Sequence, residues 1–197
     1  ASAPWYLLVE LASTARADLD GLLERALTQA VESGIVIDAV VARSLEQRND
    51  FWKLRETGPE AQRSAGGSLN HDISVPVASL PAFIERGGAL ALRLVPEGYL
   101  VAYGHAGDGN LHFNLNQRPG TDREAFFARE PALKRAVHDL VAESGGSISA
   151  EHGIGQLKVG ELERYAPAAE LDAMRRIKQA LDPNGILNPG KVLRRTP

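Results

Sequence analysis

Two histidines, His105 and His112, lie on either side of a glycine-rich stretch at residues 106–110. The flanking residues 99–103 and 111–115 are rich in aliphatic, β-branched and aromatic side chains, which predicts two strands joined by a tight Gly-Asp-Gly-Asn hairpin. If the two histidines face each other across this antiparallel pair, both imidazoles project from the same side of the sheet. Such a pair supplies two of the ligands that a divalent metal requires.

A third ligand is expected from the segment 149–155, in which Glu151 immediately precedes His152. Two neutral imidazoles and one carboxylate leave coordination positions open, as in catalytic rather than structural metal sites. We therefore expect His105, His112 and Glu151 to bind a divalent cation, namely zinc, manganese or iron. A histidine that stands beside the metal without binding it suits the role of general base, and His152 is the candidate.

Each of these residues also has a plainer interpretation. The two histidines could be hydrogen-bonded neighbours in a sheet, Glu151 could cap a helix or turn, and His152 could be an exposed loop residue. Two histidines and one carboxylate also form the facial site of iron oxygenases, and zinc hydrolases use similar ligands. An all-β oxygenase of the cupin type is disfavoured, because the chain carries several strong helical patterns.

The composition is that of an ordinary globular chain of 197 residues, 44% hydrophobic and 24% charged. A net charge of -3 without a basic cluster argues against nucleic-acid binding. Cysteine is absent, which excludes disulfides and thiolate metal sites. No apolar run reaches the length of a transmembrane segment. We expect a cytoplasmic location, with peripheral association at a membrane as an alternative, and we leave the oligomeric state open, with a homodimer as one option.

Strand and helix patterns alternate in the first part of the chain. Residues 5–11 and 35–42 are rich in apolar and β-branched types, which predicts two strands. Between them, residues 19–31 carry apolar side chains at helical spacing, and Ser13 or Thr14 is the expected cap at the start of that helix.

A capping-box pattern at residues 44–47 predicts the start of another helix. On this helix Arg48, Trp52 and Arg55 share one side. We therefore expect Arg55 to point inward with Trp52, although a structural ion pair is the alternative for this arginine.

The remaining elements are read in the same way. Residues 69–77 alternate apolar and polar side chains, which predicts a strand, and residues 87–98 are read as a connection. Residues 133–141 and 167–181 have helical periodicity.

Two further histidines fall within these elements. His71 shares the apolar side of its strand and is expected in the core or near the site rather than as a metal ligand. His138 is placed on the polar side of its helix and is expected in solvent.

The order of elements predicts an α+β fold. Strand, helix, strand and helix are followed by strand, helix, hairpin and helix, which suggests two ferredoxin-like halves. We expect these duplicated halves to share one mostly antiparallel sheet with the helices packed on one face.

Several long motifs resemble the C-terminal domain of FAD-linked oxidases, the family of the glycolate oxidase flavin subunit, D-lactate dehydrogenases and D-2-hydroxyglutarate dehydrogenase. The resemblance covers about the whole chain. Because separate long motifs occur in the family's order, chance agreement is very unlikely. The motifs occupy residues 51–56, 71–76, 104–112, 149–155 and 181–191.

The resemblance implies roles for the site residues. His105, His112 and Glu151 would bind the metal, and His152 would be the catalytic base. Three side chains are expected to bind the substrate, namely Arg55, Asn114 and Asn70.

Two positions depart from the family. Asn70 stands where the family often has a lysine, which puts one carboxylate contact in doubt and could alter which acid is accepted. Pro59 stands where members with a longer substrate carry a hydroxyl residue.

The implied reaction is oxidation of a small D-2-hydroxy acid to the 2-oxo acid, with hydride transfer to FAD. FAD would be held mainly by an N-terminal flavin-binding domain or subunit, and this chain alone is expected to be inactive without it. Residues 1–197 would form the substrate- and metal-binding domain. The tail at residues 160–197 would return toward the flavin domain, with Asn188 near the cofactor. Besides a metal-dependent oxygenase or hydrolase, the open alternative is a non-catalytic cap domain.

Overall fold

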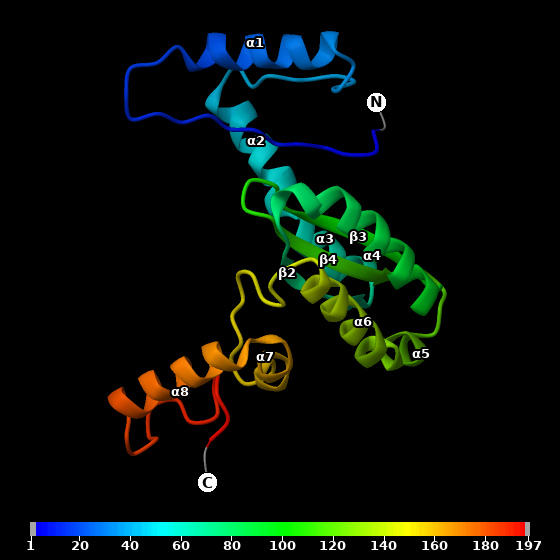
Figure 1. Cartoon of the computed structure of the whole chain (residues 1–197). Coiled ribbons are helices and arrows are strands. Elements are labelled where there is room, and N and C mark those ends of the chain that lie inside the picture. Colours follow the sequence, from blue (N-terminus) through cyan, green and yellow to red (C-terminus); the bar gives the residue numbers. More distant parts are fainter. Residues whose placement is uncertain (1–2, 196–197) are drawn as a thin grey trace. The chain divides into compact units, whose positions relative to one another are not determined.

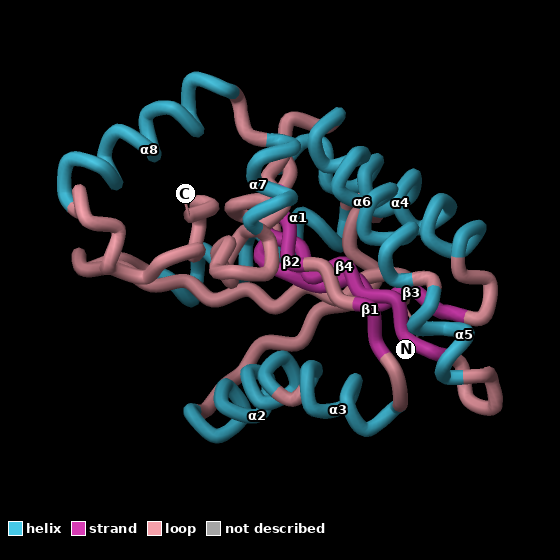
Figure 2. Tube along the Cα trace, turned by 90° about the horizontal axis from the view of Figure 1, so that it is seen from below, coloured by secondary structure: helices cyan, strands magenta, loops and turns pink. Residues whose placement is uncertain are grey.

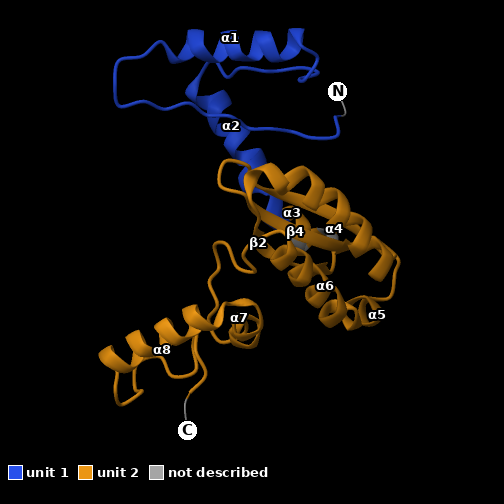
Figure 3. Ribbon diagram, in the orientation of Figure 1, with its two compact units in different colours: residues 1–60 blue, residues 61–197 orange. Residues whose placement is uncertain are grey.

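The computed structural model describes residues 3–195, and the chain forms two units, residues 1–60 and 61–197 (Figure 3). In unit 1 the helices α1 (Leu19–Glu32) and α2 (Leu45–Glu56) confirm the two helical predictions. The cap of α1 was predicted wrongly, because it is the side chain of Asp18 that accepts a hydrogen bond from the backbone N–H of Gly21 at 2.9 Å. Ser44 caps α2 as expected, by accepting from the N–H of Gln47.

The two strands predicted in unit 1 are not formed. Residues 5–11 and 35–42 have no strand assignment, and their apolar side chains are exposed, with Trp5 at 62% and Ile35 at 81%. A strand requires a neighbour that completes its ladder of hydrogen bonds, whereas β-propensity measures only how well side chains suit a pleated surface. The prediction was therefore wrong about pairing, which a local pattern does not encode.

Unit 2 is built on a four-stranded antiparallel sheet. Its strands are β1 (Ser68–Leu69), β2 (Asp72–Ser74), β3 (Gly98–His105) and β4 (Asn110–Gln117). β4 is central, because β1 and β2 pair with it along one edge and β3 pairs with it along the other. The α+β class and the antiparallel hairpin are thus confirmed, and the described strands all come from the second part of the chain.

One face of this sheet is apolar and packs against two helices. α4 (Leu80–Leu94) contacts both β3 and α6 (Glu130–Glu143), and Figures 1 and 2 show both helices along the same side of the sheet. Phe113 of β4 lies at the centre, with its ring edge-to-face against Phe83 of α4 at 5.7 Å. Other core residues are Leu69, Ile73, Leu111, Leu115, Val137 and Val141. The opposite positions of β2 and β4 carry polar side chains, and for β2 the alternation predicted this.

The connection predicted at residues 87–98 is largely helical, because α4 continues to Leu94. Gly87 and Gly88 lie inside this helix, although glycine weakens a helix interior. In the fold, a Cβ atom at Gly87 would lie 3.2 Å from the ring of Phe113. A larger side chain at this position would press against Phe113, so close packing of the helix on the sheet favours glycine here despite its low helix propensity.

The remaining helices are short or peripheral. They are η1 (Val77–Ser79), α3 (Gly58–Ala65), α5 (Arg123–Ala128), α7 (Val159–Tyr165) and α8 (Ala168–Leu181). Within residues 3–195, none of the helices has both the length and the apolar character needed to cross a membrane.

His138 was wrongly expected in solvent. Its side chain on α6 is only 2% exposed, and its Nδ1 lies 2.8 Å from the Glu161 carboxylate of α7. Arg135 donates to the same carboxylate, at 3.0 and 3.3 Å. The face of α6 that seemed polar in sequence is covered by α7, and its charges pair there.

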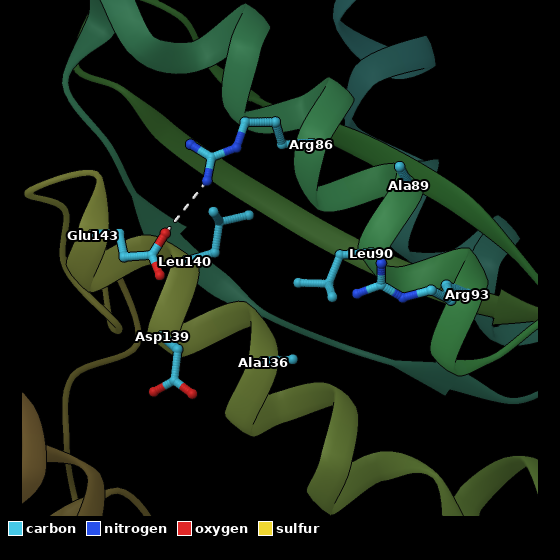
Figure 4. Close-up of a pocket in the computed structure, with 8 residues that line it drawn as sticks. All are labelled: Arg86, Ala89, Leu90, Arg93, Ala136, Asp139, Leu140 and Glu143. Atoms are coloured by element: carbon cyan, nitrogen blue, oxygen red, sulfur yellow. Dashed lines mark hydrogen bonds and ion pairs between the residues drawn. The ribbon is translucent and has the colours of Figure 1, made fainter.

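An open groove runs along the outer side of the α4 and α6 pair (Figure 4). Arg86 of α4 and Glu143 of α6 form an ion pair at 3.3 Å with both side chains more than 60% exposed. Exposed pairs of this kind contribute at most about 1 kcal/mol. The groove is thus a mixed apolar and charged surface, separate from the polar face of the sheet.

The hairpin turn provides a stability prediction. Gly109 has φ of +76°, and a Cβ atom there would overlap the carbonyl oxygen of Val75. We expect Gly109→Ala to lower the free energy of unfolding by at least about 2 kcal/mol, measured by urea denaturation. Gly107 lies in the same turn in open space and outside the left-handed region, so Gly107→Ala is the matched control. Equal loss in both variants would contradict this explanation.

His71 is buried in the core as expected, with its Nδ1 2.9 Å from the carbonyl oxygen of Phe113. Burial lowers the pKa of His71 to about 4, although the contact with Phe113 opposes this shift. Between pH 4 and 6.5 the unfolded chain therefore binds more protons than the folded one. The contribution of His71 to the free energy of unfolding is fully present above pH 6.5. This contribution falls by about 3 kcal/mol as the pH drops to 4.

The measurement is urea denaturation at several pH values for the wild type and for His71→Gln. We expect the variant to have a shallower pH dependence between pH 4 and 6.5. Part of the dependence should persist, because burial also lowers the pKa of His138. An unchanged slope in the variant would rule out His71 as the source.

Candidate active site

The polar face of the sheet brings together the side chains singled out in the hairpin. His112 of β4 pairs with Tyr103 of β3 and with Asp72 of β2, so these three side chains share one face. His105 pairs with Asn110, two positions further along. The two histidines are therefore diagonal rather than directly opposed, and they still project from the same face.

Glu151 lies against both histidines. Its Oε2 is 3.3 Å from Nε2 of His112, and its Oε1 is 3.7 Å from Nε2 of His105. The His112 side chain is only 15% exposed, while those of His105 and Glu151 are about half exposed. A carboxylate with an imidazole nitrogen near each oxygen is an arrangement that a cation could bridge.

The segment that carries Glu151 is attached to the edge of β2. Ser147 and Ser74 exchange backbone hydrogen bonds at 2.8 and 3.0 Å, and the N–H of Ala150 donates to the carbonyl oxygen of Asp72 at 3.3 Å. The segment therefore continues the sheet beyond β2. This attachment joins parts of the chain that are some 80 residues apart in sequence.

His152 lies beside this group. Its ring centroid is 5.8 Å from that of His112, and its Nδ1 is 3.5 Å from Oδ2 of Asp72. The side chain is 67% exposed, so the ring is accessible from solvent. A carboxylate near Nδ1 favours the tautomer with its proton on that nitrogen, which leaves Nε2 as the acceptor.

Asp72 was not recognised in the sequence. Its side chain is only 3% exposed, and its Oδ2 accepts hydrogen bonds from the N–H groups of Glu151 at 2.9 Å and His152 at 2.8 Å. Burial acts to raise the pKa of Asp72, but these two donors, together with the nearby His152 and Lys158, outweigh it and the pKa lies below its ordinary value. The sequence did show Asp72 at a polar position of an alternating strand. Its hydrogen-bond partners could not be predicted, because they lie some 80 residues away in sequence.

The donors suit a divalent cation. Ligand atoms of Asp72, His112, Glu151 and His152 all lie within 4.8 Å of one another, and His105 adjoins Glu151. Imidazole nitrogen and carboxylate oxygen are the donors that zinc, iron and manganese accept in proteins. The donor types therefore fit a divalent metal, and the converging group contains the predicted ligands His112 and Glu151 but not His105.

The other predicted site residues lie in different places. Asn114 is buried on the same face of β4, where its Oδ1 accepts from the N–H of His71 and its Nδ2 donates to Gln62. Asn70 is exposed and accepts from the Ser68 hydroxyl at 2.6 Å. The predicted roles of both in substrate binding stay predictions.

Arg55 and Asn188 belong to other segments. Arg55 is half-buried on α2 of unit 1, where Arg48 and Trp52 both donate to Glu10. Asn188 is exposed in the tail, with φ of 47° and its Oδ1 3.0 Å from Nζ of Lys191. Their expected contacts with substrate and cofactor likewise stay predictions.

Comparison with known proteins adds an independent observation. Residues 1–192 match the family model described as FAD linked oxidases, C-terminal domain. The chain is 38% identical to a protein of Stutzerimonas stutzeri (strain A1501) and 37% identical to one of Rattus norvegicus. Each of these two alignments covers 96% of this chain. They are named D-2-hydroxyglutarate dehydrogenase, and the rat protein is called mitochondrial. The chain spans only 40% and 34% of these two relatives.

Proposed function

The chain belongs to the family of FAD linked oxidases, C-terminal domain, and from this premise we propose that it is the substrate- and metal-binding part of a flavin-dependent D-2-hydroxy acid dehydrogenase. The observation that carries the proposal is the position of Glu151 against His105 and His112, with His152 alongside. The reaction would convert the hydroxy acid to the 2-oxo acid. Because the relatives carry that name, D-2-hydroxyglutarate is the first substrate to test.

His105, His112 and Glu151 would hold the cation. A divalent metal bound there supplies Lewis-acid chemistry, which makes a coordinated hydroxyl more acidic. His152 would accept the hydroxyl proton at Nε2, since the carboxylate of Asp72 lies near the other ring nitrogen. The exposed His152 ring can be reached by a substrate that enters from the polar face.

Three side chains would bind and orient the acid. Arg55 would hold the carboxylate in a charge-assisted contact. This contact is strongest when two N–H groups of the guanidinium donate in parallel to the two carboxylate oxygens. Asn114 would donate an amide hydrogen from β4. Asn70 lies between β1 and β2, and its short neutral side chain would influence which acids are accepted.

FAD supplies the hydride acceptor when it is bound. We propose that a flavin-binding domain or subunit holds it, and that the tail at residues 160–197, with Asn188, contacts that partner. The tail is shaped by Asp182, which accepts from the N–H groups of Ile186 and Leu187 at 3.0 and 2.9 Å. Ile186 and Leu187 themselves are 72% and 57% exposed, and they offer an apolar contact surface.

The alternatives fit the observations less well. A metal-dependent oxygenase or hydrolase would use the same three ligands, and a non-catalytic cap would not need them. The family match favours the flavin-linked dehydrogenase over both. A homodimer and a peripheral membrane location stay open proposals. The cytoplasm is the proposed compartment, although the rat relative is named mitochondrial.

The test uses the protein together with its flavin-binding domain. We expect D-2-hydroxyglutarate or a smaller D-2-hydroxy acid to bleach the flavin absorbance under anaerobic conditions, while the L-enantiomers do not. Metal analysis by mass spectrometry should find close to one divalent ion per chain. A metal-free protein that reduces flavin at the same rate would contradict the proposal.

A further inference from the structure

We propose that Asp72 is the positioning residue of this site, because it fixes the backbone that presents both Glu151 and His152. The inference rests on the proposed metal site and adds a residue to it. One oxygen, Oδ2, accepts hydrogen bonds from two consecutive N–H groups, those of Glu151 at 2.9 Å and His152 at 2.8 Å. A single carboxylate therefore sets the direction in which both side chains leave the segment.

The burial of Asp72 makes this arrangement rigid. Its side chain is 3% exposed, so its charge must be compensated by hydrogen bonds or nearby cations. The two N–H donors do this directly. Lys158 adds a nearby positive charge, and its Nζ lies 3.0 Å from the Ser149 hydroxyl and 3.3 Å from the carbonyl oxygen of Ile148. The segment before Glu151 is thus tied at several points.

Asp72 is also placed by its own strand. Its backbone carbonyl accepts from the N–H of Ala150, while its position in β2 is paired with His112 in β4. The residue therefore touches the segment with both backbone and side chain, and it is held in register with one candidate ligand. Asp72 therefore fixes the position of Glu151 relative to His112.

The occupied oxygen argues for positioning rather than metal binding by Asp72. Oδ2 already accepts two short hydrogen bonds, which use its in-plane lone pairs. Oδ1 lies 3.4 Å from Nδ2 of Asn110, a buried side chain whose own Oδ1 has no hydrogen-bond partner among the described residues. An amide at position 72 could keep the two backbone bonds, and a rotated Asn110 amide could then accept from it.

Two conservative variants separate position from charge. Asp72→Asn keeps an acceptor oxygen in place and removes the charge, whereas Asp72→Glu keeps the charge and displaces the carboxylate by one methylene. The measurements are the Co²⁺ affinity and the visible Co²⁺ spectrum of the full protein and of each variant. Asp72→Asn should bind within about threefold of the wild type, while Asp72→Glu and Asp72→Ala should bind about 10–100-fold more weakly with an altered spectrum.

Asp182 provides the matched control. It is buried and likewise accepts from two consecutive N–H groups, those of Ile186 and Leu187, but in a segment that carries none of the proposed metal ligands. Asp182→Ala should change stability and leave Co²⁺ affinity unchanged. If Asp72→Ala fails to fold, the comparison of Asn with Glu still decides.

The outcomes distinguish this inference from the proposed function. Wild-type protein that binds no Co²⁺ would overturn the metal site itself. If the wild type binds Co²⁺ and both Asp72→Glu and Asp72→Ala bind it as tightly as the wild type does, the positioning role alone is overturned. Tight binding by Asp72→Glu with loss in Asp72→Asn would also overturn it, since charge rather than position would then matter.

Discussion

Replacing His152 with alanine is expected to lower the rate of substrate-dependent flavin reduction by about 10²–10⁴-fold, the usual contribution of a general base. The proposed base is the ring nitrogen Nε2 of His152. Among residues 3–195, the other two imidazoles at the site, those of His105 and His112, are proposed metal ligands. Because the side chain is 67% exposed, its removal should cost little stability. The measurement is stopped-flow reduction of the flavin by saturating substrate.

Two controls accompany His152→Ala, namely the metal content of the variant and the rescue of its rate by added imidazole. Metal content by mass spectrometry should equal that of the wild type, because His152 is not a proposed ligand. Added imidazole should restore part of the rate. A variant that keeps its metal and reduces flavin within about threefold of the wild-type rate would remove His152 from the mechanism.

Glu151→Gln is expected to weaken divalent-metal affinity by at least about 100-fold, more than the loss usual for residues that only support a ligand. Glu151 lies between His105 and His112, with one oxygen toward each. The amide has the same shape, but it lacks the charge and replaces one donor oxygen with an N–H₂ group. The measurement is metal content after dialysis, together with the dissociation constant for Zn²⁺.

Glu143→Gln is the matched control. Glu143 is an exposed glutamate of α6 whose partner is Arg86, and it lies on the groove rather than on the polar face. Its variant should retain the metal fully. Glu151→Gln that retains the metal as tightly as Glu143→Gln would show that the cation, if bound, uses other ligands.

The hairpin and its two histidines were predictable because their signals are local. Glycine and aspartate between two apolar runs specify a tight turn, and the pairing of β3 with β4 then follows from chain proximity. The same is true of His71, whose alternation with Ile73 placed it in the core. α8 was predicted within one residue of its start for the same reason.

Other features depend on contacts between distant segments. Residues 5–11 have the composition of a strand, yet no ladder forms there in the described structure. At Gly87 a small residue suits the helix because Phe113 lies close to it, and His138 is buried because α7 covers it. Asp72 gains its importance from two backbone N–H groups that are some 80 residues away.

The amino-acid sequence by itself determined the chemical types at the site, the hairpin that carries two imidazoles, the α+β class and the family. Only the tertiary structure decided that Glu151 lies against both histidines and that Asp72 holds the segment bearing Glu151 and His152. Turns and periodic faces arise from neighbours in the chain, so residue order encodes them directly. Contacts across many residues arise from the packing of the whole sheet, which no single segment specifies.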